Sequence, residues 1–402
     1  MSYHLMKLRD VCDFIDGDRG KNYPSNGELT SSGSCLFLNT GNVTKNGFNF
    51  EKCQFITAEK DSLLRKGKLR HGDVVLTTRG TLGNVGFFSN KLPYHSVRIN
   101  SGMLILRASA EFDPRFLFYA VQSPMFQAQI NGVKTGSAQP QLPLKTLKEM
   151  KVSFPSREGQ ERIAGVLSAY DELIENNRRQ IKLLEEAAQR LYKEWFIDLK
   201  FPGHETTPIV DGLPEGWKYG ILDDLLDECG ARMGMHEREM FEHYLPIDSL
   251  PSKSFTCWES RPICEAESSL LAFKENDFIF GAMRPYFHKV VVAPYAGITR
   301  STCFVLCSRD AMASYFAYMS LFWEQTIRYA TSISVGTTMP YVRWSDLKRM
   351  KLVIPRQDVQ RSYSSMVASV FEEILVLEKH IATAREARDR LLPKLMSGEI
   401  EV

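Results

Sequence analysis

Apolar residues recur at alternating steps of four and three along two stretches of the chain, 163–195 and 363–395. Each pattern lasts more than four heptads, which is typical of a coiled coil rather than of an ordinary surface helix. We therefore predict two long helices that pair with each other. The residues expected along their seam are Ile163, Leu167, Tyr170, Ile174, Asn177, Ile181, Leu184 and Leu191 in the first helix, and Val367, Val370, Ile374, Leu377, Ile381 and Leu391 in the second.

Two seam positions are polar, Asn177 in the first helix and Arg388 in the second. A single Asn in a seam often fixes register and pairing at some cost in stability. Pro393 predicts that the second helix kinks or stops near its end. The alternative is two amphipathic helices packed into separate domains, but this leaves their shared register unexplained.

Both helices belong to an internal repeat. Stretches 135–196 and 334–396 align at an offset of 200, so that Pro155 meets Pro355. A looser match continues upstream, where 222–227 resembles 8–13 and 276–280 resembles 72–76. Two copies of one unit can mimic a two-fold dimer, and we therefore predict a pseudo-two-fold repeat with antiparallel helices. The predicted limits are a globular domain at 1–155, a helix at 156–197, a linker at 198–214, a second globular domain at 215–355, and a helix with a tail at 356–402.

The globular domains read as mixed α/β structure. In the first domain, short apolar runs bounded by glycine and polar residues predict strands. They lie at 36–40, 74–78, 103–106 and 150–154, and helices are expected at 8–15 and 115–130. The expected fold class is therefore mixed α+β, with two globular domains separated by a long coiled coil.

Composition and charge indicate where the protein is located and what it could bind. The 402 residues are 44% hydrophobic, yet no apolar run has the length of a membrane span, and the N-terminus lacks a signal-peptide core. We therefore expect a cytoplasmic protein without a membrane partner. The net charge is only +2, but residues 1–155 carry 20 Lys and Arg against 12 Asp and Glu, whereas 208–355 carry 15 against 18. A basic first domain suggests a polyanion partner.

Motifs for catalysis are missing. The chain has no Asn/Asp-Pro-Pro-Tyr/Phe quartet, no Gly-x-Gly-x-x-Gly loop and no Gly-Lys-Ser/Thr P-loop. The eight cysteines form no Cys-x-x-Cys pair, and no zinc site is expected. We therefore expect no enzyme, no cofactor and no metal in this chain.

The sequence resembles the specificity subunits of type I restriction–modification systems. The segments that carry the resemblance are MKVSFP at 150–155, MKLVIP at 350–355, Trp195-Phe196, LPEGW at 213–217 and SGEI at 397–400. The resemblance implies two target recognition domains, each reading one half of a split site on double-stranded DNA. It also implies that the helices seat two methyltransferase subunits and that restriction subunits join. Those partners would use S-adenosylmethionine, ATP and magnesium.

Polar loops in both domains could read base edges, because Arg suits guanine and Asn or Gln suits adenine in the major groove. The candidates are Thr78, Arg79, Gly80, Thr81, Lys134, Thr135, Gly136, Ser137, Gln139 and Gln141 in the first domain, and Arg284, Tyr286, His288, Lys289, Thr337, Thr338, Tyr341 and Arg343 in the second. The basic run Arg65, Lys66, Lys68 and Arg70 could contact phosphates. The plainer interpretation is that the loops only shape the entry to each helix and that the basic run is a solvated face.

Two other functions compete with DNA recognition. A self-contained methyltransferase or nuclease would need the cofactor motifs that are missing. A protein–protein scaffold would bind partners with little dependence on salt, whereas DNA binding weakens steeply as salt rises.

Overall fold

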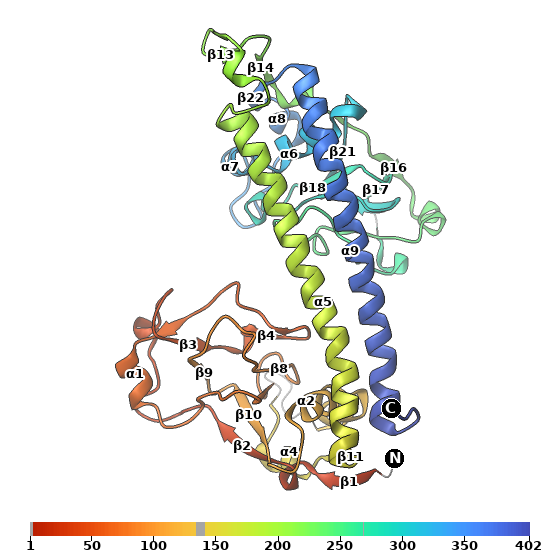
Figure 1. The fold of residues 1–402 in the computed structure, drawn as a ribbon. Helices are drawn as coiled ribbons and strands as arrows, with labels where there is room; N and C mark the ends of the chain where they lie inside the picture. Colours follow the sequence, from red (N-terminus) through yellow and green to blue (C-terminus); the bar gives the residue numbers. More distant parts are fainter. Residues whose placement is uncertain (1–2, 134–140, 268) are drawn as a thin grey trace. The chain divides into compact units, whose positions relative to one another are not determined.

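The computed structural model describes residues 3–133, 141–267 and 269–402 (Figure 1). The chain forms two compact units. The first unit comprises Met1–Glu172 and Ala384–Val402, and the second comprises Leu173–Thr383. Each unit therefore contains one globular region and a part of both long helices. Among the described residues, no helix is both long enough and apolar enough to cross a membrane.

The first unit is built on a four-stranded antiparallel sheet in the order β2-β10-β7-β8. In the central strand β10 (Met103–Ala108), Leu104 and Leu106 pack into one core cluster and Met103 and Ile105 into another. Burial on both faces explains why the sequence of this strand is a continuous apolar run. The other three strands are β2 (Cys12–Asp16), β7 (Val74–Thr77) and β8 (Val85–Phe87).

Smaller elements complete the first unit. A three-stranded sheet has the order β6-β3-β9, and two two-stranded sheets pair β1 with β11 and β4 with β5. Their strands are β1 (His4–Lys7), β3 (Cys35–Leu38), β4 (Val43–Thr44), β5 (Gly47–Phe48), β6 (Phe55–Ile56), β9 (Val97–Ile99) and β11 (Lys151–Phe154). The short helices are α1 (Ala58–Leu63), α2 (Pro114–Gln122), α3 (Pro124–Gly132) and α4 (Leu144–Glu149).

The second unit repeats the four-stranded sheet of the first, but its three-stranded sheet is entirely antiparallel, whereas one pair in the first unit, β3 with β9, is parallel. Its four-stranded sheet has the order β15-β21-β18-β19, its three-stranded sheet has the order β16-β17-β20, and β14 pairs with β22 as β1 pairs with β11. The strands are β14 (Lys218–Ile221), β15 (Leu226–Glu228), β16 (Ala231–Met233), β17 (Leu270–Phe273), β18 (Phe278–Gly281), β19 (Val290–Val292), β20 (Gly297–Arg300), β21 (Cys303–Ser308) and β22 (Lys351–Ile354). The helices are α6 (Ser314–Phe322), α7 (Glu324–Ser332) and α8 (Trp344–Leu347).

The predicted repeat is confirmed and extends further upstream than the sequence match. Strands β10 and β21 have bounds that differ by 200, as do helices α2 and α6. Strands β1 and β14 differ by 214. The globular regions are therefore two copies of one mixed α/β fold, and the insertions that change the offset precede β10 and β21.

Two local predictions in the first domain are wrong. Residues 8–15 form a short 3-10 turn and strand β2 instead of a helix, because β2 is held at the sheet edge by pairing with β10. The helix expected at 115–130 is two helices, α2 and α3, which meet at Ser123 before Pro124. Proline disfavours helical geometry in the residue before it, and the Ser123 hydroxyl caps α3 by accepting a hydrogen bond from Phe126 N at 3.3 Å.

The two long helices are α5 (Arg157–Tyr192), which a π-helical turn extends over Lys193–Ile197, and α9 (Gln357–Ser397). In the first unit, Ile163 of α5 shares a core cluster with Leu395 of α9. In the second unit, the Tyr363 hydroxyl of α9 donates to Ala188 O of α5 at 3.0 Å. The start of one helix thus meets the end of the other, and the expected antiparallel pairing is confirmed within each unit (Figure 1).

None of the predicted seam residues is exposed. Leu191 and Leu391 are half-buried, while their neighbours Tyr192 and Leu392 are buried. A straight helix drifts against a strict heptad, which explains why the contact face moves by one residue toward the helix ends. Helix α9 continues through Pro393, so this proline does not end it.

The linker expected at 198–214 contains a 3-10 turn (His204–Thr206) and the hairpin formed by β12 (Ile209–Val210) and β13 (Leu213–Pro214).

Candidate nucleic-acid interface

In the first unit, the loop after β7 is fixed by main-chain hydrogen bonds. Gly102 O accepts from Thr78 N at 2.9 Å and from Arg79 N at 3.2 Å, while Leu142 N donates to Thr78 O at 3.1 Å. Arg79 also forms an isolated β-bridge with Gln141. The loop therefore lies between two other segments, and the exposed Arg79 side chain makes no hydrogen bond or ion pair with the part of the chain that the structure describes.

The second unit repeats this bonding at equivalent positions. Ala282 N donates to Thr302 O at 2.9 Å, as Thr78 N donates to Gly102 O, and Val342 N donates to Ala282 O at 3.0 Å. An isolated bridge joins Met283 to Tyr341, as Arg79 is joined to Gln141. These contacts are made by the main chain, so the two units share a loop framework although their side chains differ.

A hairpin extends the framework of the second unit. Val335 and Tyr341 exchange two main-chain hydrogen bonds of 2.9 Å around the turn at 336–340. Large apolar side chains are exposed on this hairpin and on the neighbouring turn after β18. They are Tyr286, Phe287, Val335, Met339 and Tyr341, with exposed fractions between 40% and 58%. The sequence analysis selected polar loop residues and therefore missed Phe287, Val335 and Met339.

The two arginines beside the hairpin are held by local contacts. Arg284 has a left-handed backbone, with φ of 49°, and its guanidinium donates to Thr338 O at 3.2 Å. Arg343 Nε donates to the Tyr341 hydroxyl at 3.1 Å. Thr337 and Thr338 are exposed at the tip of the hairpin. The polar candidates of the second unit thus surround an apolar surface.

Two predicted base-reading residues of the second unit do not meet the requirement for exposure. His288 is only 4% exposed, its ring lies 4.4 Å from that of Phe322, and burial lowers the pKa of its imidazole. Lys289 is half-buried, and its Nζ donates to Ile247 O at 2.7 Å. We therefore remove both from the set of proposed base readers.

The remaining first-unit candidates divide into two groups. Gly80, Thr81 and Gln141 are exposed and Thr78 is half-buried. Gly80 has φ of 68° beside the Thr40 side chain, and the Thr81 hydroxyl donates to Thr40 O at 3.1 Å. The candidates that lie outside the described residues are Lys134, Thr135, Gly136, Ser137 and Gln139.

The predicted phosphate contacts also divide. Arg65, Lys66 and Arg70 are exposed, whereas Lys68 is half-buried. Lys68 Nζ lies 2.5 Å from Asp61 Oδ2 and 2.7 Å from Ser96 Oγ. Lys68 therefore stabilises its own unit, and we exclude it from the phosphate contacts.

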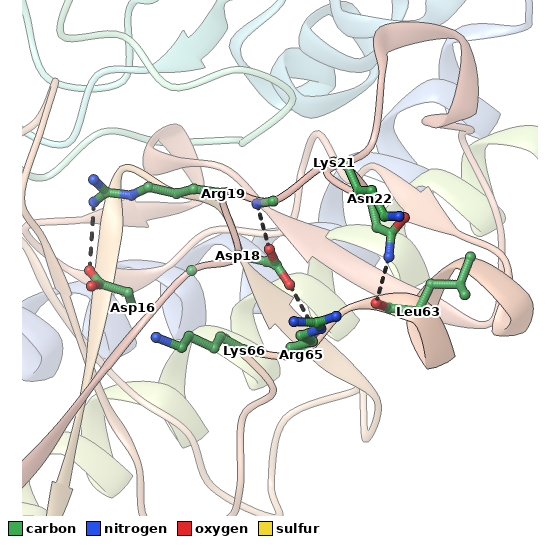
Figure 2. Close-up of a pocket in the computed structure, with 10 residues that line it drawn as sticks. Asp16, Asp18, Arg19, Lys21, Asn22, Leu63, Arg65 and Lys66 are labelled. Atoms are coloured by element: carbon green, nitrogen blue, oxygen red, sulfur yellow. Dashed lines mark hydrogen bonds and ion pairs between the residues drawn. The ribbon is translucent and has the colours of Figure 1, made fainter.

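A hollow of about 450 Å³ opens beside Arg65 and Lys66 (Figure 2). Two further cations line it, Arg19 and Lys21, which the sequence analysis did not select. They lie more than 40 positions away along the chain, so no local pattern could have joined them to the basic run. Within the described ranges, no group of three or more His, Cys, Asp and Glu side chains could hold a metal ion.

Comparison with known proteins identifies the family. Residues 2–186 match the type I restriction modification DNA specificity domain. The chain is 30% identical over 347 residues to the type I restriction enzyme MjaIX specificity subunit of Methanocaldococcus jannaschii, covering 82% of this chain and 78% of the relative. It is 21% identical over 464 residues to the HindI specificity subunit of Haemophilus influenzae, covering 98% of this chain and all of the relative.

A solved structure has the same fold. The S subunit of a type I restriction–modification system from M. genitalium superimposes with a TM-score of 0.60 at 15% identity, covering 98% of this chain and 96% of that one. The repeated topology, the paired long helices and the relatives agree, and the chain belongs to the family of type I restriction enzyme specificity subunits.

Proposed function

We propose that this chain is the non-catalytic DNA-recognition subunit of a type I restriction–modification complex, and that each globular region reads one half of a bipartite site. The observation that carries the proposal is the duplicated loop framework. The same main-chain bonds hold the loop at Thr78 in the first unit and the loop at Ala282 in the second. Equivalent loops with different exposed side chains suit two readers of different sequences.

In the first unit, the reading chemistry is polar. Arg79 has an exposed guanidinium that can bond to guanine O6 and N7, and Gln141 can bond to adenine. Thr81 adds a hydroxyl that donates to Thr40 O and can still accept a hydrogen bond from a base edge. This unit also carries the excess of positive charge found in residues 1–155, which favours the approach of DNA.

In the second unit, the reading chemistry is largely apolar. Met339 and Tyr341 on the hairpin and Tyr286 on the adjacent turn are exposed, while the two nearby arginines are engaged in local hydrogen bonds. Apolar side chains recognise the methyl group of thymine in the major groove. We therefore propose that the second half-site contains A·T pairs whose thymine methyl groups contact this surface.

The two long helices serve assembly in this proposal. They seat two methyltransferase subunits, fix the spacing between the half-sites, and allow restriction subunits to join. The partner subunits use S-adenosylmethionine, ATP and magnesium, while this chain supplies no reacting group. The domain limits given above from the sequence define the parts that would be exchanged between relatives.

The test is to express the chain with its methyltransferase partner and to map N6-methyladenine in cellular DNA by single-molecule sequencing. We expect one bipartite motif that disappears when this chain is deleted. Arg79→Ala should relax one half of the motif, and the double variant Met339→Ala/Tyr341→Ala should relax only the other. A motif that survives deletion of the chain would overturn the proposal. Changes in both halves from either variant would refute independent reading.

A further inference from the structure

The hollow in the first unit is shaped by close packing of two segments that are distant in sequence. Gly17 packs against the turn at 100–101 so closely that a Cβ added to Gly17 would lie 2.1 Å from Asn100 O. Asp18 joins the walls, because its carboxylate accepts hydrogen bonds of 2.8 Å from both Gly20 N and Arg65 N (Figure 2). These main-chain donors hold the pKa of the Asp18 carboxyl below its usual range. Both oxygens of the Asp18 carboxylate are therefore occupied by main-chain groups in the wall of the hollow.

The remaining charges leave the hollow positive. Its lining contains four cations and two carboxylates, and Asp16 lies 3.6 Å from Arg19. Within the described part of the chain, the side chains of Lys21, Arg65 and Lys66 make no hydrogen bond or ion pair, and all three are exposed. Three unpaired cations around one concave surface favour an anionic ligand.

The hollow adjoins the reading loop of the same unit. Arg19 Nη2 lies 3.4 Å from Ser101 O. The next residue, Gly102, accepts the hydrogen bonds that fix Thr78 and Arg79. The hollow and the loop that carries Arg79 therefore both contact the turn at 100–102.

The second unit has no equivalent cations at these positions. At the offset of 204 that relates β7 to β18, Arg65 and Lys66 fall opposite Ser269 and Leu270, and Leu270 is buried. At the offset of 214 that relates β1 to β14, Lys21 falls opposite Met235. The cationic hollow is thus a property of the first unit within the described residues.

We propose that this hollow binds a backbone phosphate of the DNA that flanks the first half-site. The inference rests on the proposed function and adds a division of labour to it. The first unit anchors the duplex by charge, whereas the second contributes apolar base contacts. A phosphate contact positions the protein without carrying sequence information. The hollow should therefore control affinity and salt dependence but leave the recognised motif unchanged.

The test uses the complex of this chain with its methyltransferase partner and duplexes with the cognate or an unrelated sequence. The variant is Arg65→Gln/Lys66→Gln, and the matched control is Arg349→Gln/Lys351→Gln, which removes the same charge from two exposed residues of the second unit. Each lost phosphate contact should reduce the slope of log affinity against log salt by about 0.9. We expect a reduction of about one to two for the variant, equal losses on both duplexes, and an unchanged slope for the control.

Methylphosphonate substitution of single DNA phosphates gives a second measurement, because it removes the charge at one backbone position. One neutral position beside the first half-site should weaken the wild-type complex and leave the variant unaffected. Equal salt slopes for variant, control and wild type would overturn the phosphate site, as would a changed methylation motif. Both results can occur while the wild-type complex still reads its motif, so they are distinguishable from failure of the proposed function.

Discussion

The ion pair between Arg388 and Asp171 provides a quantitative test of how the long helices are held together in the first unit. Arg388 Nη1 of α9 lies 2.6 Å from Asp171 Oδ1 of α5, and the other carboxylate oxygen accepts a 2.6 Å hydrogen bond from the Tyr119 hydroxyl of α2. The equivalent positions in the second unit are Ala188 and Phe371, which are buried and apolar. The polar residue that interrupted the heptad pattern therefore has a specific partner.

The expected loss of stability depends on how deeply the ion pair is buried. The Arg388 and Asp171 side chains are 25% and 31% exposed. Removing one partner of a fully buried pair costs roughly 3–5 kcal/mol, whereas exposed pairs contribute about 0–1 kcal/mol. We expect Arg388→Ala to lower the free energy of unfolding by about 2 kcal/mol, between these two limits. Asp171→Ala should cost at least as much, because it also leaves the buried Tyr119 hydroxyl without its acceptor. The double-mutant cycle should give a coupling of about 1 kcal/mol.

The assay can separate the two units within the intact chain. All five tryptophans lie between residues 195 and 344, so their fluorescence reports on the second unit. Hydrogen exchange of peptides from α2 reports on the first. We expect both single variants to speed exchange in α2 and to leave the urea midpoint of tryptophan fluorescence unchanged. A coupling below about 0.3 kcal/mol, which is the usual error of additivity, would refute the assigned role. If the variants destabilised both units equally, as measured by α2 exchange and by the tryptophan fluorescence midpoint, the ion pair would not act on the first unit alone.

Three further predictions concern the second unit and the reading loops. Burial raises the pKa of Glu185 and of Glu378, so the folded second unit binds protons more readily than the unfolded chain. Its urea midpoint should rise as pH falls from neutral toward 4.5, the ordinary pKa of glutamate, and Glu185→Gln should reduce that rise; a midpoint that falls would contradict the assignment. Replacing thymidine by deoxyuridine should weaken binding at the half-site that we propose Met339 and Tyr341 contact, and an effect confined to the other half would contradict apolar reading. Arg79→Ala should cost about 1–3 kcal/mol of discrimination at one base pair in competition binding, and equal losses on all sequences would contradict a base contact.

The repeat, the long helices and the fold class could be predicted from the sequence because heptad periodicity and a fixed offset are visible along the chain. Strand β2 could not be predicted from local pattern. Its residues pair with β10, which lies about 90 positions later, and such pairing overrides a weak helical signal. The shift of the seam from Leu391 to Leu392 likewise depends on how a straight helix turns against its partner.

The sequence predicts the candidate loops but not the burial of each side chain in them. Loops after β7 and β18 were recognised as polar turns bounded by strands. Burial of His288 depends on Phe322, and the engagement of Lys68 depends on Asp61 and Ser96, which no local pattern places together. Met339 has no hydrogen-bonding side chain, but apolar side chains can contact the thymine methyl group.

The shared framework is consistent with the proposal that one fold holds two different readers. The bonds that fix each loop join main-chain groups, Thr78 to Gly102 in one unit and Ala282 to Thr302 in the other. Main-chain bonds do not require a particular side chain, so the residue beside them can change from the exposed Arg79 to the half-buried Met283 without refolding the loop. The buried residues behind the framework have less freedom, because cores are close-packed and feel the loss of a methylene. Under the proposed function, divergence in this chain is therefore expected on the exposed loop edge, where a substitution would change the base that is read and leave the scaffold intact.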